Sequence, residues 1–233
     1  MADYDGDGLV DLVSGSTCCQ RPPCFYVFRR LKDGSFAERK RVNLLFPPEE
    51  YDKNEFPANG LQSRVAVADW NGDGTPDVLI GGNCRTLGVV YGPLAGKDEL
   101  TVQRVWPKGK EPLGPMTTNP CVADWDGDGL ADLIVGGTVG EVRGVYWLRN
   151  VGTKREPKLG PPQLLVADDD LRHTTGISVA DWNGDGRLDL IAGRLEYEVE
   201  PDGKYTPRHH KLWVYLRRAI DGRDFVGRTK RRS

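Results

Sequence analysis

The 233-residue sequence lacks several features that would indicate common protein classes. It contains no run of 18 apolar residues, so we expect no helix that spans a membrane. It has no sustained apolar pattern with a 3.6-residue period, which argues against amphipathic helices. No signal peptide is recognisable at its start. These absences leave a β-rich fold as the main expectation.

The groups that perform most enzyme chemistry are also scarce. There are only three histidines, His173, His209 and His210, and the adjacent pair is expected to face solvent. The sequence has no Gly-x-Ser-x-Gly motif, no His/Glu/Cys cluster with zinc spacing and no phosphate-binding loop. We therefore expect a binding protein rather than an enzyme.

Cysteines are few and odd in number. The five are Cys18, Cys19, Cys24, Cys84 and Cys121, so at least one has no partner within the chain. A bridge from Cys18 or Cys19 to Cys24 and a bridge from Cys18 to Cys84 both remain open. Cys121 is expected to behave as a buried small hydrophobic residue.

One motif, by contrast, is present in four near copies. The copy ADWDGDGLADLIVGG begins at Ala123, and its relatives begin at Ala2, Ala68 and Ala180. Each copy passes from an acidic, Gly-rich stretch into a short apolar stretch that ends in small residues, which is typical of a buried strand. The repeats therefore predict an all-β array of similar units.

The acidic stretch has the spacing of a cation-binding loop. Counted from its first aspartate, it has oxygen-bearing side chains at positions 1, 3, 5 and 9 and a glycine at position 6. Calcium accepts six to eight oxygens in flexible geometry, including a backbone carbonyl, which position 7 would supply. Without a cation, such crowded carboxylates repel one another and their pKa values rise. The residues at position 7 are Leu9, Thr75, Leu130 and Arg187.

Two other interpretations of the acidic stretch compete with the calcium loop. An EF-hand loop starts in the same way but needs a glutamate at position 12. The residues at position 12 are Ser14, Ile80, Val135 and Ala192, which excludes the EF-hand. An acidic Gly-rich turn without metal is the second alternative, and recurrence in four copies favours the metal site over it.

The motif as a whole resembles a known repeat. A hydrophobic strand, then Asp-Trp-Asn/Asp-Gly-Asp-Gly-x-x-Asp, then Leu-Ile-x-Gly-Gly is similar to the FG-GAP/VCBS repeat, the calcium-loop blade of integrin-α-like β-propellers. The resemblance implies one Ca²⁺ per loop, and a loop that joins the innermost strand of a blade to the second. The side-chain ligands it implies are Asp3, Asp5, Asp7 and Asp11; Asp69, Asn71, Asp73 and Asp77; Asp124, Asp126, Asp128 and Asp132; and Asp181, Asn183, Asp185 and Asp189.

The resemblance also implies the architecture, an all-β propeller, and the four repeats of this sequence predict four blades. We expect an open or partial ring, because neither end supplies a spare strand, and unpaired edges of this kind invite association. The blades are expected at 1–45 (inner strand missing), 46–110 (connector and second blade), 111–168 and 169–233, together forming one repeat domain. The aromatic residue at position 2 of each loop is expected to pack between blades.

The expected propeller also indicates where a partner would bind. Loop residues at the mouth of a propeller channel are its default binding site, and here they are Arg64, Asn119 and His173. We expect a calcium-binding scaffold for an extracellular glycan or protein, with no nucleic-acid partner. Basic residues near both ends fit a solvated strand face or, alternatively, an anionic polysaccharide. The alternative function is a propeller-type polysaccharide lyase or a fragment of a larger enzyme, which would use His173 with Arg64 or Arg194.

The expected location is extracellular, periplasmic or at the cell surface. Calcium loops of extracellular modules bind with dissociation constants of roughly 10⁻⁴ to 10⁻³ M and would be empty at cytosolic calcium.

Overall fold

The described part of the chain folds entirely from β-strands. The computed structural model describes residues 2–16, 22–48, 63–82, 87–106, 112–113, 119–167, 174–199, 201, 205–220 and 223–229. These residues contain no helix, and hence none long and apolar enough to cross a membrane. Their strands form four sheets of four strands each. The expectation of an all-β fold is confirmed.

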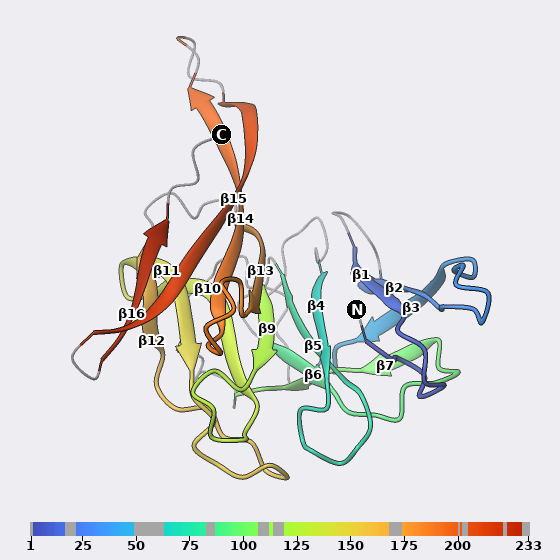
Figure 1. Ribbon diagram of the computed structural model, residues 1–233. Helices are drawn as coiled ribbons and strands as arrows, with labels where there is room; N and C mark the ends of the chain where they lie inside the picture. The colour runs from blue at the N-terminus through green and yellow to red at the C-terminus, as the bar shows by residue number, and fades with distance from the viewer. Residues whose placement is uncertain are drawn as a thin grey trace.

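The four sheets follow the sequence repeats in chain order (Figure 1). The first contains β1 (Leu12–Gly15), β2 (Cys24–Phe28), β3 (Lys40–Leu45) and β7 (Glu99–Thr101). The second contains β4 (Ser63–Ala68), β5 (Asp77–Gly82), β6 (Gly88–Val90) and β8 (Gln103–Arg104). The third contains β9 (Pro120–Ala123), β10 (Asp132–Val139), β11 (Val142–Leu148) and β12 (Gln163–Ala167). The fourth contains β13 (Thr174–Ala180), β14 (Asp189–Val199), β15 (Tyr205–Ile220) and β16 (Arg223–Thr229).

Each acidic loop connects two antiparallel neighbours within a sheet. The loops join β4 to β5, β9 to β10 and β13 to β14, and in each pair the alanine before the loop lies opposite the aspartate at position 9. In the first repeat a single bridge between Ala2 and Asp11 takes the place of the first strand pair. The motif therefore lies where the resemblance placed it, between the first and second strands of a repeat.

Hydrophobic cores fill the spaces between successive sheets. Neighbouring residues of a strand point to opposite faces, so in β5 Val78 and Ile80 enter the first core whereas Leu79 enters the second. In β10, Leu133 enters the second core and Ile134 enters the third. The continuous apolar stretch after each loop is explained by this burial on both faces. The first strands also contact one another in series, β4 against β9 and β9 against β13.

The aromatic residue at position 2 packs into the core between its own sheet and the next one. Tyr4, Trp70 and Trp125 are 4%, 3% and 2% exposed and belong to the first, second and third cores respectively. Trp182 in the fourth repeat is 45% exposed. The predicted packing role holds for three repeats, and the fourth differs because the described chain places no further sheet beyond it.

The segment from Asp98 to Val102 leaves the sheet of its own repeat and joins the sheet of the first. Its strand β7 pairs in parallel with β3 of the first sheet, and Val102 N–H donates to the carbonyl of Leu45 (2.8 Å). Shortly afterwards β8 pairs with β6 of the second sheet. Leu100 and Val102 are buried in the first core, so packing between the two sheets draws this segment across.

The hairpin of the fourth repeat is long, because the β14 and β15 register continues until Val199 lies opposite Tyr205.

Of the two disulfide bridges left open by the sequence, the bridge to Cys24 is wrong, because Cys24 is a free, fully buried thiol. Cys18, Cys19 and Cys84 lie outside the described residues. Cys121 is also free, and burial raises the pKa of its thiol to about 11.

Candidate metal centre

Two glycines shape each acidic loop. The glycines at positions 4 and 6 have φ between 64° and 89° in all four loops. Only glycine adopts this left-handed backbone without strain, and at Gly127 and Gly129 there is open space for a side chain, so the requirement comes from the backbone. These turns fold the loop back toward its first aspartate, so that in the first loop the N–H groups of Gly6 and Gly8 reach Asp3.

The aspartate at position 1 organises the loop backbone. In the first loop Asp3 Oδ1 accepts N–H bonds from Gly6 (2.8 Å) and Asp7 (3.1 Å), and Oδ2 accepts one from Gly8 (2.9 Å). Asp124 and Asp181 each accept the same three bonds. Carboxylate oxygens have more than one lone pair each, so these bonds leave capacity for a cation.

The aspartate at position 9 joins the loop to the third strand of its repeat. All four of these side chains are fully buried: Asp11, Asp77, Asp132 and Asp189. In every repeat one carboxylate oxygen accepts the N–H of position 2 at 2.9–3.1 Å, and the other accepts a backbone N–H beside the third strand at 2.7–2.9 Å. Burial raises the pKa of Asp77 and Asp132, and these hydrogen bonds oppose the rise.

Positions 3 and 5 divide the loops into two types. The first and third loops, which we term Asp-type, have aspartates at both positions. In the third loop Arg149 bridges the two carboxylates, with Nε 2.6 Å from Asp126 Oδ2 and Nη2 2.9 Å from Asp128 Oδ2. Arg29 bridges Asp5 and Asp7 of the first loop in the same way. The adjacent carboxylates raise the pKa of both arginines.

The second and fourth loops, which we term Asn-type, have asparagine at position 3. Asn71 Nδ2 donates to Asp73 Oδ2 (3.0 Å), and Asn183 Nδ2 donates to Asp185 Oδ2 (3.1 Å). Hydrogen bonds from the Thr75 hydroxyl and backbone lower the pKa of Asp73, with a smaller contribution from Asn71. Among the described side chains, neither Asp73 nor Asp185 forms an ion pair like those of the Asp-type loops.

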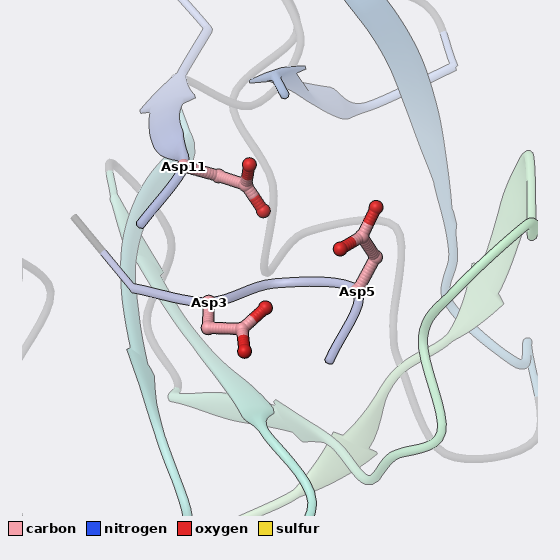
Figure 2. A group of neighbouring side chains, drawn as sticks. All are labelled: Asp3, Asp5 and Asp11. Atoms are coloured by element: carbon pink, nitrogen blue, oxygen red, sulfur yellow. The ribbon is translucent and has the colours of Figure 1, made fainter. Parts of the chain in front are cut away.

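The carboxylates of the Asp-type loops converge on a shared space. Figure 2 shows Asp3, Asp5 and Asp11 turned toward one another. Their ligand atoms all lie within 4.8 Å of one another, as do those of Asp124, Asp126 and Asp128. Oxygens bound to one Ca²⁺ at 2.3–2.6 Å are separated by up to about 5 Å, so the spacing suits that ion.

One oxygen in the third loop gives a separate indication. Asp126 Oδ1 is buried and accepts no hydrogen bond within the described structure. The other oxygen of this carboxylate, Oδ2, forms the ion pair with Arg149. Buried acceptors normally have a partner. The donor set of all four loops consists of oxygens alone, the choice of hard cations. The residues present therefore fit calcium.

The remaining predicted residues are those at position 7, within the loops, and the three predicted ligand-binding residues, which lie apart from them. At position 7, the backbone N–H groups of Leu9, Thr75, Leu130 and Arg187 donate to the position 5 carboxylates at 2.8–3.0 Å. Arg64 lies near the start of β4 and buried Asn119 directly precedes the neighbouring β9, so both are at one end of adjacent first strands. Burial lowers the pKa of Arg64. His173 lies outside the described residues.

Arg29 and Arg149 were not predicted as site residues. The sequence does contain a signal for them, because position 3 alternates between aspartate and asparagine along the chain. The two loops with aspartate have one more negative charge than the other two, and a nearby cation could balance that charge.

Comparison with known proteins agrees with the repeat pattern. A family model described as FG-GAP-like repeat matches residues 3–80 and 124–192, well over half of the chain. The chain belongs to the FG-GAP-like repeat family. All four acidic loops fall within the matched FG-GAP-like segments, which confirms the resemblance seen in the sequence. FG-GAP repeats are typical of extracellular or surface proteins. No curated protein matches this chain.

Proposed function

We propose that this chain is a calcium-binding scaffold in which the four sheets are blades of an open propeller arc. The observation that carries the proposal is the shared backbone of the four loops, with two left-handed glycines in each, together with the convergence of three carboxylates in the first and in the third loop. In each loop the side chains at positions 1, 3, 5 and 9 and the carbonyl at position 7 would hold one ion.

The role of calcium in this proposal is to stabilise the fold. The folded first and third loops each hold the ligand atoms of three carboxylates within 4.8 Å of one another, whereas an unfolded chain lets the carboxylates separate and hydrate. A ligand that binds only the folded state stabilises it by about 2.7 kcal/mol per site at a hundredfold excess over Kd. The loops also connect the first and second strands of each repeat, so their stability affects the whole arc.

The scaffold would present a binding surface at the starts of its first strands. Arg64 and Asn119 support this placement, because β4 and β9 are neighbours and both residues lie at the same end. A glycan or protein outside the cell is the partner we propose, in keeping with where FG-GAP repeats occur. No catalytic role is proposed, since the lyase alternative depends on His173, which lies outside the described residues.

The calcium proposal is tested by thermal unfolding in millimolar calcium and in chelator, with calorimetric titration of uptake. We expect a melting temperature several degrees higher in calcium. Asp128→Ala should remove one loop's share of that increase. Asp98→Ala is the control, because Asp98 is 77% exposed and pairs with Lys40 outside every loop. Equal melting temperatures with calcium and with chelator would overturn the proposal.

Export is tested separately by fractionating cells that produce the native full-length protein. We expect it outside the cytosol, and retention of the intact protein in the cytosol would contradict this part of the proposal.

A further inference from the structure

The two loop types match the residue that faces them from the third strand. We define the facing residue as the one directly after the strand partner of position 10. The partners of position 10 are Phe28, Val90, Leu148 and Tyr215. The facing residues are therefore Arg29, Tyr91, Arg149 and Leu216. The facing residue is an arginine in both repeats that have aspartate at position 3. It is not an arginine in either repeat that has asparagine at position 3.

The facing residue lies close to the loop in both types. In the Asp-type loops its guanidinium bridges positions 3 and 5. In the second repeat burial raises the pKa of Tyr91, and the charge of Asp77 adds to the rise. In the two Asp-type repeats the positive charge at this place in the fold therefore acts directly on the carboxylates at positions 3 and 5.

When only positions 1, 3, 5 and 9 and the facing residue are counted, the match makes the formal charge equal in all four repeats. Four carboxylates and one guanidinium in an Asp-type repeat have the same formal charge, −3, as three carboxylates and a neutral facing residue in an Asn-type repeat. Other arginines of the described chain lie near the Asn-type loops without bridging positions 3 and 5. Arg217 donates its backbone N–H to Asp189, and its guanidinium lies over the ring of Trp125 in the third loop. The exposed Arg187 occupies position 7 of the fourth loop, and Arg155 of the third repeat lowers the pKa of Asp73 as the last of several causes.

We propose that Arg29 and Arg149 are internal counter-cations, which balance the extra aspartate of their loops and compete with calcium for it. This inference rests on the proposed calcium function. Ligand charge alone predicts weaker binding in the Asn-type loops. With the arginines included, the Asp-type loops lose that advantage, because a divalent ion must displace a guanidinium that is already paired with the same carboxylates.

The exposure of the two arginines allows such competition. Their side chains are 51% and 44% exposed, whereas Asp5 and Asp126 are 12% and 18% exposed. Exposed ion pairs are weak, so an arginine leaves for solvent at little cost when a divalent ion enters. In the absence of calcium the same arginine reduces the repulsion between the two aspartates.

The test compares the wild-type protein, Arg29→Ala/Arg149→Ala and the control Lys40→Ala. The control removes one exposed ion pair, Lys40 Nζ to Asp98 Oδ1 at 2.7 Å, away from every loop. Calorimetric titration with calcium at low salt should show two sites in the double variant that bind about twofold to fivefold more tightly, the range that exposed ion pairs represent. In chelator the double variant should melt about 2–4 °C below the control.

Three results are informative. Tighter calcium sites together with a lower melting temperature in chelator support the inference. Calcium uptake that is unchanged or weaker in the double variant overturns it and leaves the proposed function standing, because the arginines would then orient the ligands instead of competing. Absence of calcium uptake by all three proteins overturns both, since the arginines would have no cation to replace.

Discussion

The Asp-type and Asn-type loops share a backbone but differ in how they balance charge. Both types have the two left-handed glycines and the buried aspartate at position 9. At positions 3 and 5 an Asp-type loop has two carboxylates bridged by an arginine, whereas an Asn-type loop has an amide that donates to one carboxylate. The backbone is therefore set by features common to all repeats, while the charge at positions 3 and 5 is matched repeat by repeat to the facing residue.

The largest expected effect is on the free energy of unfolding when the aromatic residue at position 2 is removed. It tests whether that cost depends on the loop type. Trp125 belongs to an Asp-type loop and Trp70 to an Asn-type loop, yet both are buried. Trp125→Ala and Trp70→Ala should each lower the free energy of unfolding by about 3–5 kcal/mol, as expected for a large buried aromatic. Trp182→Ala should cost much less, because Trp182 is 45% exposed.

Urea unfolding measures these three variants under one condition. A cost at Trp182 equal to that at Trp125 would show that the loop itself, and not the neighbouring sheet, determines the contribution of this residue.

A second prediction concerns the aspartate at position 9, which both loop types share. Asp132→Ala and Asp77→Ala should each destabilise the protein by about 3 kcal/mol in chelator, because two backbone N–H groups lose a charged, buried acceptor. Asp132→Asn, which keeps one acceptor oxygen, should fall between wild type and Asp132→Ala. Urea unfolding in chelator measures the cost without any contribution from calcium.

Asp98→Ala serves as the exposed control for both alanine variants. A large difference between Asp132→Ala and Asp77→Ala would contradict the view that the two loop types have the same structural anchor.

The smallest effect converts one loop type into the other. Asn71→Asp places a second carboxylate beside Asp73 with no facing arginine, and like charges about 4 Å apart in water repel by about 1 kcal/mol. We expect a loss of that order in chelator. Adding Tyr91→Arg should recover part of it, whereas Tyr91→Gln, which removes the same aromatic packing without adding charge, should not. Thermal unfolding at low salt measures all four proteins.

Equal stability of the arginine and glutamine versions would show that the facing residue has no electrostatic role, and that the match between loop type and arginine is coincidental.

Much of the fold and of the candidate site was predictable because the information is local. The spacing of Asp124, Asp126, Asp128 and Asp132 defines the loop, and the apolar stretch after it defines a strand buried on both faces. Four copies of this pattern predict an all-β repeat protein, and the family match confirms that prediction. These features depend on neighbouring residues, whose spacing directly determines which side chains share a face.

Other features were decided only by the tertiary structure. The segment around Leu100 and Val102 belongs to two sheets because the core between them buries both side chains. Trp182 differs from Trp125 in exposure although the local sequences are nearly the same, because a following sheet covers only Trp125. Arg149 follows Asp126 by 23 residues, and only the register of β10 against β11 brings its guanidinium to the loop. In each case the outcome depends on contacts between segments distant in the chain, and residue spacing within one segment contains no information about them.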